Sequence, residues 1–203
     1  MDSTDRSFRV PDELSTGEFV LRPIRESDAE LDHEAVMSSK EFLRDWEQTG
    51  WPKEDFTVEA NREDLVRLRR RHENGESFTY TVLNPQGDSC LGCVYVVPTS
   101  AELFAKAEVR PTGDSRWSEF EIAVYFWVRE SRTTDGLDAR LLDAMDPWFR
   151  RQWNVRYLLL TNERVSHQVD LLESTGCTLR FELAYSSKPG KELAYSMHST
   201  QEG

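Results

Sequence analysis

Residues Glu121–Trp148 read EIAVYFWVRESRTTDGLDARLLDAMDPW. The apolar run Ile122–Val128 predicts a buried strand, and apolar side chains at helical spacing begin at about Gly136. A strand that enters a helix through a polar turn directs the free N–H groups and positive dipole end of the helix toward one point, which suits a phosphate or pyrophosphate. Asp135 and Asp138 lie in the same turn and would repel that anion. The stretch therefore predicts the geometry of an anion site without its usual charge.

Composition places the chain among soluble globular proteins. Its 203 residues suffice for one domain with a substantial core, and 38% are hydrophobic while 31% are charged. The formal net charge of −12 argues against nucleic acid or an anionic membrane as the main partner, and could attract cationic substrates such as amines. No apolar run reaches the roughly 18 residues of a membrane span, and the first residues do not resemble a signal peptide. We therefore expect a cytoplasmic protein.

Turn signals and periodicity divide the chain into a polar arm, residues 1–17, expected to be flexible or loosely docked, and one domain, residues 18–203. Strands are expected at Phe19–Arg22, Phe78–Leu83, Leu91–Val97, Glu119–Val128, Tyr157–Thr161, Thr178–Tyr185 and Glu192–His198. Helices are expected from a capping box at Ser27–Glu30 to Met37, from Thr57 to Gly75, near Ala101–Ala107, from Gly136 to Trp148 and from Val165 to Gly176. The order predicts a single-domain α/β fold, with a mixed, mostly antiparallel twisted sheet and helices on both faces.

Several phrases in this order resemble the GNAT superfamily of acetyl-coenzyme-A-dependent N-acetyltransferases. Phe19-Val20-Leu21-Arg22-Pro23 is similar to its first strand, Phe126-Trp127-Val128-Arg129 to the end of its central strand, and Leu171-Leu172-Glu173-Ser174-Thr175-Gly176 to a common helix ending. The resemblance spans about Phe19 to His198. It implies a GNAT-like fold, acetyl-CoA as the acyl donor and an amine as the acceptor.

The family signature, Arg/Gln-x-x-Gly-x-Gly/Ala, falls on Thr133–Asp138, where only Gly136 matches. The resemblance implies that this turn meets the cofactor pyrophosphate through Thr133, Thr134, Gly136, Leu137, Asp138 and Ala139. It also implies that Phe126, Trp127 and Val128 pair with the pantetheine arm, and that Asn162 is a polar contact. A purely structural reading remains open, in which Thr134 or Asp135 caps the helix.

Amine acetylation needs a base that removes a proton from the attacking ammonium. Alternation along the strand places Glu121 on the face of Ala123 and Tyr125, so Glu121 is the first candidate and Glu119 the second. Both could instead be solvated charges at the end of a strand. The tyrosine that often serves the family as general acid is absent, since Leu172 stands at its position.

Other conspicuous features receive structural interpretations. Cys90 and Cys93 match C-x-x-C, but strand alternation would put them on opposite faces, and we expect no metal site. The basic run Arg67–Arg71 is typical of a solvated helix face. Trp46, Trp51 and Trp117 could line an acceptor pocket, but the core or an interface contains such residues more often.

The sequence thus predicts an acyl-CoA-dependent N-acyltransferase acting on a small-molecule or peptide amine. The alternative is a catalytically inactive GNAT-fold ligand-binding or protein-interaction module, favoured by the two aspartates and the missing tyrosine. Transfer from an aminoacyl-tRNA fits poorly with the acidic balance. An edge strand or the last hairpin could support a homodimer, and no nucleic acid or membrane partner is expected.

Overall fold

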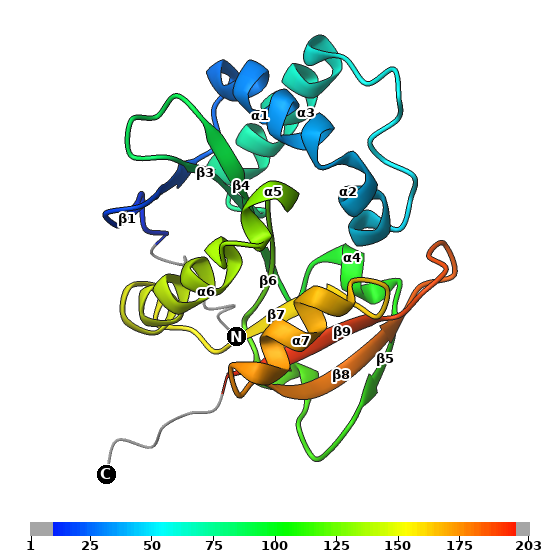
Figure 1. Cartoon of the computed structure of the whole chain (residues 1–203). Coiled ribbons are helices and arrows are strands. Elements are labelled where there is room, and N and C mark those ends of the chain that lie inside the picture. The colour runs from blue at the N-terminus through cyan, green and yellow to red at the C-terminus, as the bar shows by residue number, and fades with distance from the viewer. Residues whose placement is uncertain (1–9, 198–203) are drawn as a thin grey trace.

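A computed structural model describes residues 10–197. In that part of the chain, nine strands form one twisted sheet in the order β1-β2-β3-β4-β6-β7-β9-β8-β5 (Figure 1). All neighbouring strands are antiparallel except β6 and β7. The strands are β1 Leu14–Ser15, β2 Val20–Pro23, β3 Phe78–Leu83, β4 Cys90–Pro98, β5 Glu108–Pro111, β6 Ile122–Val128, β7 Tyr157–Asn162, β8 Thr178–Ala184 and β9 Glu192–Ser196. The predicted α/β class and mostly antiparallel sheet are confirmed.

Helices cover both faces of this sheet. The α-helices are α1 Ala29–Ser38, α2 Lys40–Glu47, α3 Val58–Glu73, α4 Glu102–Ala105, α5 Glu130–Thr133, α6 Leu137–Trp148 and α7 Ser166–Ser174. Helices α6 and α7 pack on one face, and α1 and α2 pack on the opposite face against Cys93 and Trp127. Within the described range, no helix is both long enough and apolar enough to cross a membrane.

Helix α6 forms because its apolar side chains recur at helical spacing and all meet the sheet. The predicted contacts Leu137, Leu141, Met145 and Trp148 are each at most 2% exposed. Pro147 lacks the N–H that an α-helix needs, so it predicts a kink or an end of the helix at this point. The α-helix ends one residue later, at Trp148, and the chain continues in a π-helical turn, Phe149–Trp153.

Two termini of helices show where local prediction succeeds and where it fails. Thr57 caps α3 as expected, because its hydroxyl accepts the Ala60 N–H over 3.2 Å. The predicted capping box at Ser27–Glu30 is wrong. The cap forms two residues earlier, at Arg25, where the Asp28 carboxylate accepts the Arg25 N–H over 3.0 Å while it pairs with Arg22.

The ends of the described chain and one connection also differ from expectation. Residues 1–9 and His198 lie outside the described range, but Leu14 and Ser15, within the predicted arm, pair with β2. The polar residues 99–118 predict a long connection, and within it lies strand β5. It is an exposed edge strand on β8, and its Glu-Val-Arg-Pro sequence lacks the apolar alternation that would identify it.

Strand β4 contains a bulge that the sequence does not announce. The register pairs Val82 with Gly92 and Leu83 with Cys90, so Leu91 is the extra residue. The bulge turns Cys90 and Cys93 to the same face, where their sulfurs lie 3.9 and 3.4 Å from Asp32 Oδ1. The prediction of opposite faces is therefore wrong, because strict alternation assumes an unbroken ladder.

Gly92→Ala should be strongly destabilising. A Cβ at Gly92 would lie 2.0 Å from the carbonyl oxygen of Trp127 and 2.8 Å from the Cα of Val128, and neither backbone atom can rotate away. We expect the free energy of unfolding to fall by at least about 3 kcal/mol, measured by chemical denaturation. Gly113→Ala is the matched control, since a Cβ there meets nothing within 4 Å. Equal stability of the two variants would contradict the described bulge.

Candidate functional site

The central feature of the sheet is the place where β6 and β7 part. Their parallel ladder runs from Ile122 with Tyr157 to Tyr125 with Leu160 and ends there. Phe126, Trp127 and Val128 remain paired with β4 only. The side chain of Gln168, from α7, reaches into this divergence and donates its Nε2–H to Phe126 O over 2.8 Å. The backbone beyond Tyr125 therefore accepts an amide hydrogen bond, here from a side chain.

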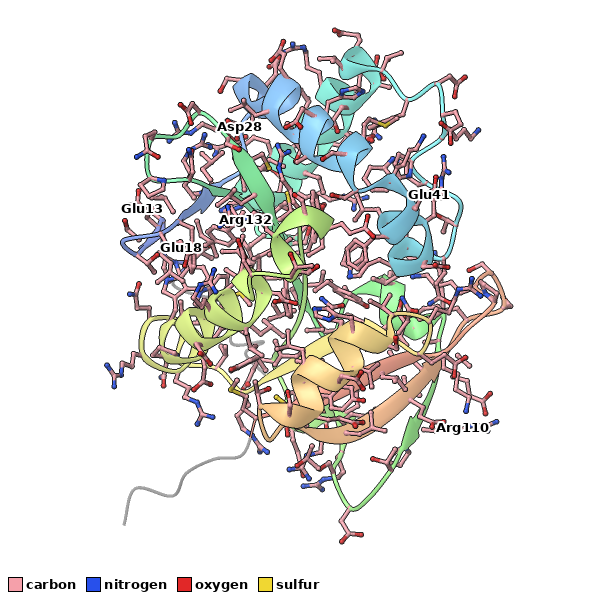
Figure 2. The ribbon with its side chains drawn as sticks, viewed as in Figure 1. Glu13, Glu18, Asp28, Glu41, Arg110 and Arg132 are labelled. Carbon is pink, nitrogen blue, oxygen red and sulfur yellow. The ribbon has the colours of Figure 1, made fainter. Side chains whose placement is uncertain are left out.

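At the turn before α6, Arg132 and Arg140 form four ion pairs with the carboxylates of Glu18 and Asp135. Arg132 Nε lies 2.6 Å from Asp135 Oδ2, and Arg140 Nε lies 2.7 Å from Glu18 Oε2. Arg132 is also 3.5 Å from Glu18, and Figure 2 shows these two residues on the same side of the molecule. The hydrogen bond from Arg132 lowers the pKa of Asp135. Both arginines at this turn are thus already neutralised.

Asp138, the residue that replaces the small side chain of the family motif, is turned inward. It is only 4% exposed, accepts the Ala139 N–H over 2.9 Å, and lies 2.6 Å from Nε2 of His167 at the start of α7. The carboxylate thereby joins the first turns of α6 and α7. It occupies space that the predicted anion site would need.

The other predicted cofactor-binding residues are placed as follows. Gly136, at φ 74°, is the N-cap of α6, Leu137 is in the core, and the hydroxyl of Thr133 donates to Glu130 O over 2.7 Å. Exposed Thr134 is the C-cap of α5, so the alternative that it caps α6 does not hold. Asn162 lies at the end of β7, where its Nδ2 donates to Asp45 O and Trp46 O over 3.2 and 2.8 Å. These contacts join Asn162 to α2 and not to the turn.

The predicted bases lie at the opposite end of β6. Glu121 precedes the strand and its carboxylate accepts the Arg156 N–H over 2.8 Å, while Glu119 is ion-paired with Arg116 at 3.1 Å. Five residues of extended chain separate Glu121 from Phe126, which is about 17 Å at about 3.4 Å per residue. The structure therefore does not bring Glu121 or Glu119 together with the divergence of the strands.

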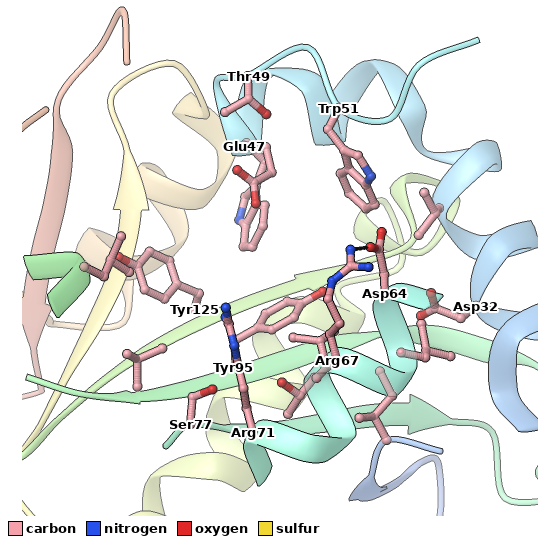
Figure 3. Close-up of a pocket in the computed structure, with 18 of the residues that line it drawn as sticks. Asp32, Glu47, Thr49, Trp51, Asp64, Arg67, Arg71, Ser77, Tyr95 and Tyr125 are labelled. Atoms are coloured by element: carbon pink, nitrogen blue, oxygen red, sulfur yellow. Dashed lines mark hydrogen bonds and ion pairs between the residues drawn. The ribbon is translucent and has the colours of Figure 1, made fainter. Parts of the chain in front are cut away.

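A cavity of about 620 Å³ opens on the face of the sheet covered by α2 and α3 (Figure 3). Tyr95 of β4 and Tyr125 of β6 line the sheet side, and Trp46 and Trp51 line the side of α2 and the loop that follows it. Trp46 and Trp51 thus line a cavity, whereas Trp117 packs against a separate core cluster, and a role of this cavity as acceptor pocket stays a prediction. Because Tyr125 is also the last β6 residue paired with β7, the cavity adjoins the divergence.

Glu47, the last residue of α2, points into this cavity (Figure 3). Burial raises the pKa of its carboxyl group, the charge of Glu192 adds to the rise, and the charge of Lys188 opposes it. Among residues 10–197 it has no hydrogen-bond or ion-pair partner. It is therefore a desolvated carboxylate that remains available to a ligand.

Glu192 of β9 lies at the same end of the cavity and is, by contrast, fully engaged. Its Oε1 lies 2.6 Å from Lys188 Nζ, and its Oε2 accepts the hydroxyl hydrogen of Tyr125 over 2.8 Å. The last hairpin is fixed to the central strand by this contact. Nowhere in residues 10–197 do three His, Cys, Asp or Glu side chains gather in a way that could hold a metal ion.

Sequence reasoning missed Glu47, Tyr125 and Glu192 as cavity residues. Glu47 follows Trp46 in the stretch Trp46–Trp51, already singled out as aromatic, and this was the available signal. The partnership of Tyr125 and Glu192 spans 67 residues and depends on strand order, which no local pattern gives.

Neither a family model nor a curated protein sequence matches the chain. Solved structures do. RimL, a ribosomal L7/L12 α-N-protein acetyltransferase in complex with coenzyme A, has a TM-score of 0.65 at 16% identity, covering 90% of this chain and 96% of its own. The ribosomal-protein-S5-alanine acetyltransferase from Vibrio fischeri has a TM-score of 0.65 at 16% sequence identity, and the match covers 93% of this chain and 97% of that protein.

The microcin C7 self-immunity acetyltransferase MccE, in complex with acetyl-CoA and AMP, gives a TM-score of 0.64 at 11% identity, covering 89% of this chain and 92% of its own. At these identities the likeness concerns the fold. With its order of strands, its β6–β7 divergence and these neighbours, the chain has the fold of the GNAT acetyltransferases.

Proposed function

We propose that the protein transfers an acyl group from a coenzyme A thioester, acetyl-CoA first, to an amine held in the 620 Å³ cavity. The support is the fold shared with acetyltransferases solved with coenzyme A or acetyl-CoA, and a cavity that adjoins the diverging strands. The hydrogen bond of Gln168 indicates how a pantetheine arm would fit at this strand. Its primary amide donates to Phe126 O, so this backbone takes an amide donor of the kind such an arm carries.

Glu47 is the group we propose as the base. Acetyl-CoA, when bound, supplies an activated acetyl carbonyl. The carboxylate of Glu47 takes a proton from the ammonium of the acceptor, directly or through one water, and so frees the nitrogen lone pair for attack. The new C–N bond replaces the C–S bond. A second proton leaves the nitrogen as the amide forms and goes to the released thiolate, while the first passes from Glu47 to solvent. Glu121 and Glu119 stay predictions, with no part in this scheme.

One observation carries the proposal: Glu47 is a partly buried carboxylate that lines the cavity with Tyr125 and has no hydrogen-bond or ion-pair partner in the described chain. The test has two readouts. Calorimetric titration with acetyl-CoA at low salt should show binding, and thiol release should follow the addition of primary amines. Absence of both heat and a shift in melting temperature would overturn the proposal.

The pH profile of kcat/KM should rise through the pKa of Glu47, because a base works in its deprotonated form. Burial raises that pKa, so the midpoint should lie above the ordinary value of 4.5. Removal of the opposing cation in Lys188→Gln should move the midpoint to higher pH. A profile that is flat from about pH 4 to about pH 8, or unmoved in Lys188→Gln, would contradict the assignment.

A second candidate function is a non-catalytic module on this fold. The Asp138–His167 contact and the Gln168–Phe126 hydrogen bond favour it, since a donor bound at this turn and at this strand would have to displace or accommodate both side chains. The thiol-release assay separates the two candidates, because a binding module gives no turnover with any amine. The cytoplasmic location, the amine's identity as small molecule or peptide, and a homodimer remain predictions.

A further inference from the structure

The cavity contains a second buried carboxylate, Asp32 of α1, far along the chain from Glu47. It is 4% exposed and lines the same cavity. Asn61 Nδ2 donates to its Oδ2 over 2.9 Å, and the thiol of Cys93 lies 3.4 Å from its Oδ1. Both groups donate toward the ionised form of Asp32, and so oppose the rise in its pKa that burial causes.

No cation balances that form. In residues 10–197 no Lys, Arg or His lies within ion-pair distance of Asp32. Burial raises the pKa of its carboxyl group, and no nearby cation opposes that rise. The neighbouring Asp28, whose charge adds to that rise, is itself paired with Arg22 at 2.7 Å. A desolvated carboxylate with donors but without a countercharge gains from a cation that a ligand brings.

The remaining charges of the cavity cancel in pairs, apart from one rim residue. Lys188 is paired with Glu192, and Arg67 with Asp64. Arg71, an exposed residue of α3, also lines the cavity and has no ion-pair partner among residues 10–197. Among the carboxylates that line the cavity, Glu47 and Asp32 are the two without an ion-pair partner in the described chain.

Glu47 and Asp32 flank one aromatic wall. Tyr95 belongs to this wall, and the charges of both carboxylates add to the burial that raises the pKa of its hydroxyl. Trp51 lies above Tyr95 in Figure 3, and the centre of the Trp46 ring lies 6.0 Å from that of Tyr95. Aromatic faces favour both methylene groups and cations. The cavity therefore offers an anion, an apolar stretch and a second anion.

We propose that the acceptor is an aliphatic diamine, which places the amine to be acylated at Glu47 and its second ammonium at Asp32. The inference rests on the proposed function, and deepens it by assigning the class of acceptor. A volume of about 620 Å³ holds such a small molecule with room for the donor end. Asp32 is in this arrangement a specificity-determining residue, and only Glu47 takes part in proton transfer.

The experiment compares matched amines on the full chain. Thiol release from acetyl-CoA is followed with α,ω-diamines of three to six carbons and with the n-alkylamines of the same lengths. The best diamine should exceed its monoamine by about 10-fold or more in kcat/KM, and Asp32→Asn should bring this ratio close to one. Asp45→Asn makes the same change at an exposed ion pair with Arg164 and should keep the ratio.

Binding measured without acetyl-CoA separates failure of this inference from failure of the proposed function. Calorimetry should show that the best diamine binds about 10-fold more weakly to Asp32→Asn than to the unaltered chain, whether or not turnover occurs. A melting curve confirms that the variant is folded. Equal affinities, or a diamine preference that survives Asp32→Asn, would overturn the inference. Turnover with monoamines only would overturn it while the acyltransferase proposal stands.

Discussion

Glu47→Gln should lower kcat by about 10²- to 10⁴-fold and leave the affinity for acetyl-CoA unchanged. Glutamine keeps the size of the side chain at the end of α2 but cannot take a proton from the acceptor. Steady-state thiol release gives kcat, and calorimetry gives the affinity. The ascending limb of the pH profile should disappear together with the activity.

Stability provides the control for this variant. A carboxyl group whose pKa is raised on folding destabilises the folded state as pH rises from the ordinary value of 4.5 through the raised value. Glu47→Gln removes that penalty, so its melting temperature at neutral pH should equal or exceed that of the unaltered chain. Glu41→Gln makes the same change at an exposed site of α2, 70% exposed, and should leave kcat as it is. Full activity in Glu47→Gln would remove Glu47 from the mechanism.

Asp138→Ala should tighten the binding of coenzyme A by about 10-fold or more, which corresponds to about 1.4 kcal/mol. The substitution removes a buried carboxylate from the first turn of α6, where an anion is repelled by its charge and obstructed by its bulk. Ala139 N–H, which the carboxylate now accepts, becomes available to a phosphate. Calorimetric titration of both proteins with coenzyme A measures the change.

Asp143→Ala is the matched control, since Asp143 is exposed on the same helix. Loss of the Asp138 charge near the N-terminus of α6 should itself cost about 0.3–1 kcal/mol of stability. Coenzyme A affinity that is unchanged or weaker in Asp138→Ala would favour the non-catalytic module. Asp138 and His167 would then hold two helices together for a structural purpose.

The sequence allowed most of the scaffold to be predicted, because its elements follow from local rules. Apolar spacing identified α6, and Asn84–Asp88 identified the hairpin between β3 and β4. The GNAT resemblance also predicted the strand β6 and the turn after it. These features depend on neighbours within a few residues.

The chemistry of the site was harder to predict, because it depends on contacts between distant segments. Asp138 was expected to repel an anion at the turn, and a residue 29 positions away, His167, determines where its carboxylate lies. The alternation of side chains along the strand indicates Glu121 as the base, but strand β6 begins after it, and the Glu121 carboxylate accepts the Arg156 N–H. Glu47 lies in a helix that packs over the sheet, and only the tertiary structure shows that its side chain is partly buried and lines the cavity.

The short parallel ladder between β6 and β7 also has a mechanical consequence. Four residue pairs are the only strand pairing, in the described chain, between the strands β1 to β4 with β6 and the strands β7, β9, β8 and β5. Each group has its own continuous antiparallel pairing, so a load applied across the sheet concentrates on this seam. A load that separates the two groups of strands should open the sheet along the line where the proposed donor enters, because no other strand pairing in the described chain joins the two groups.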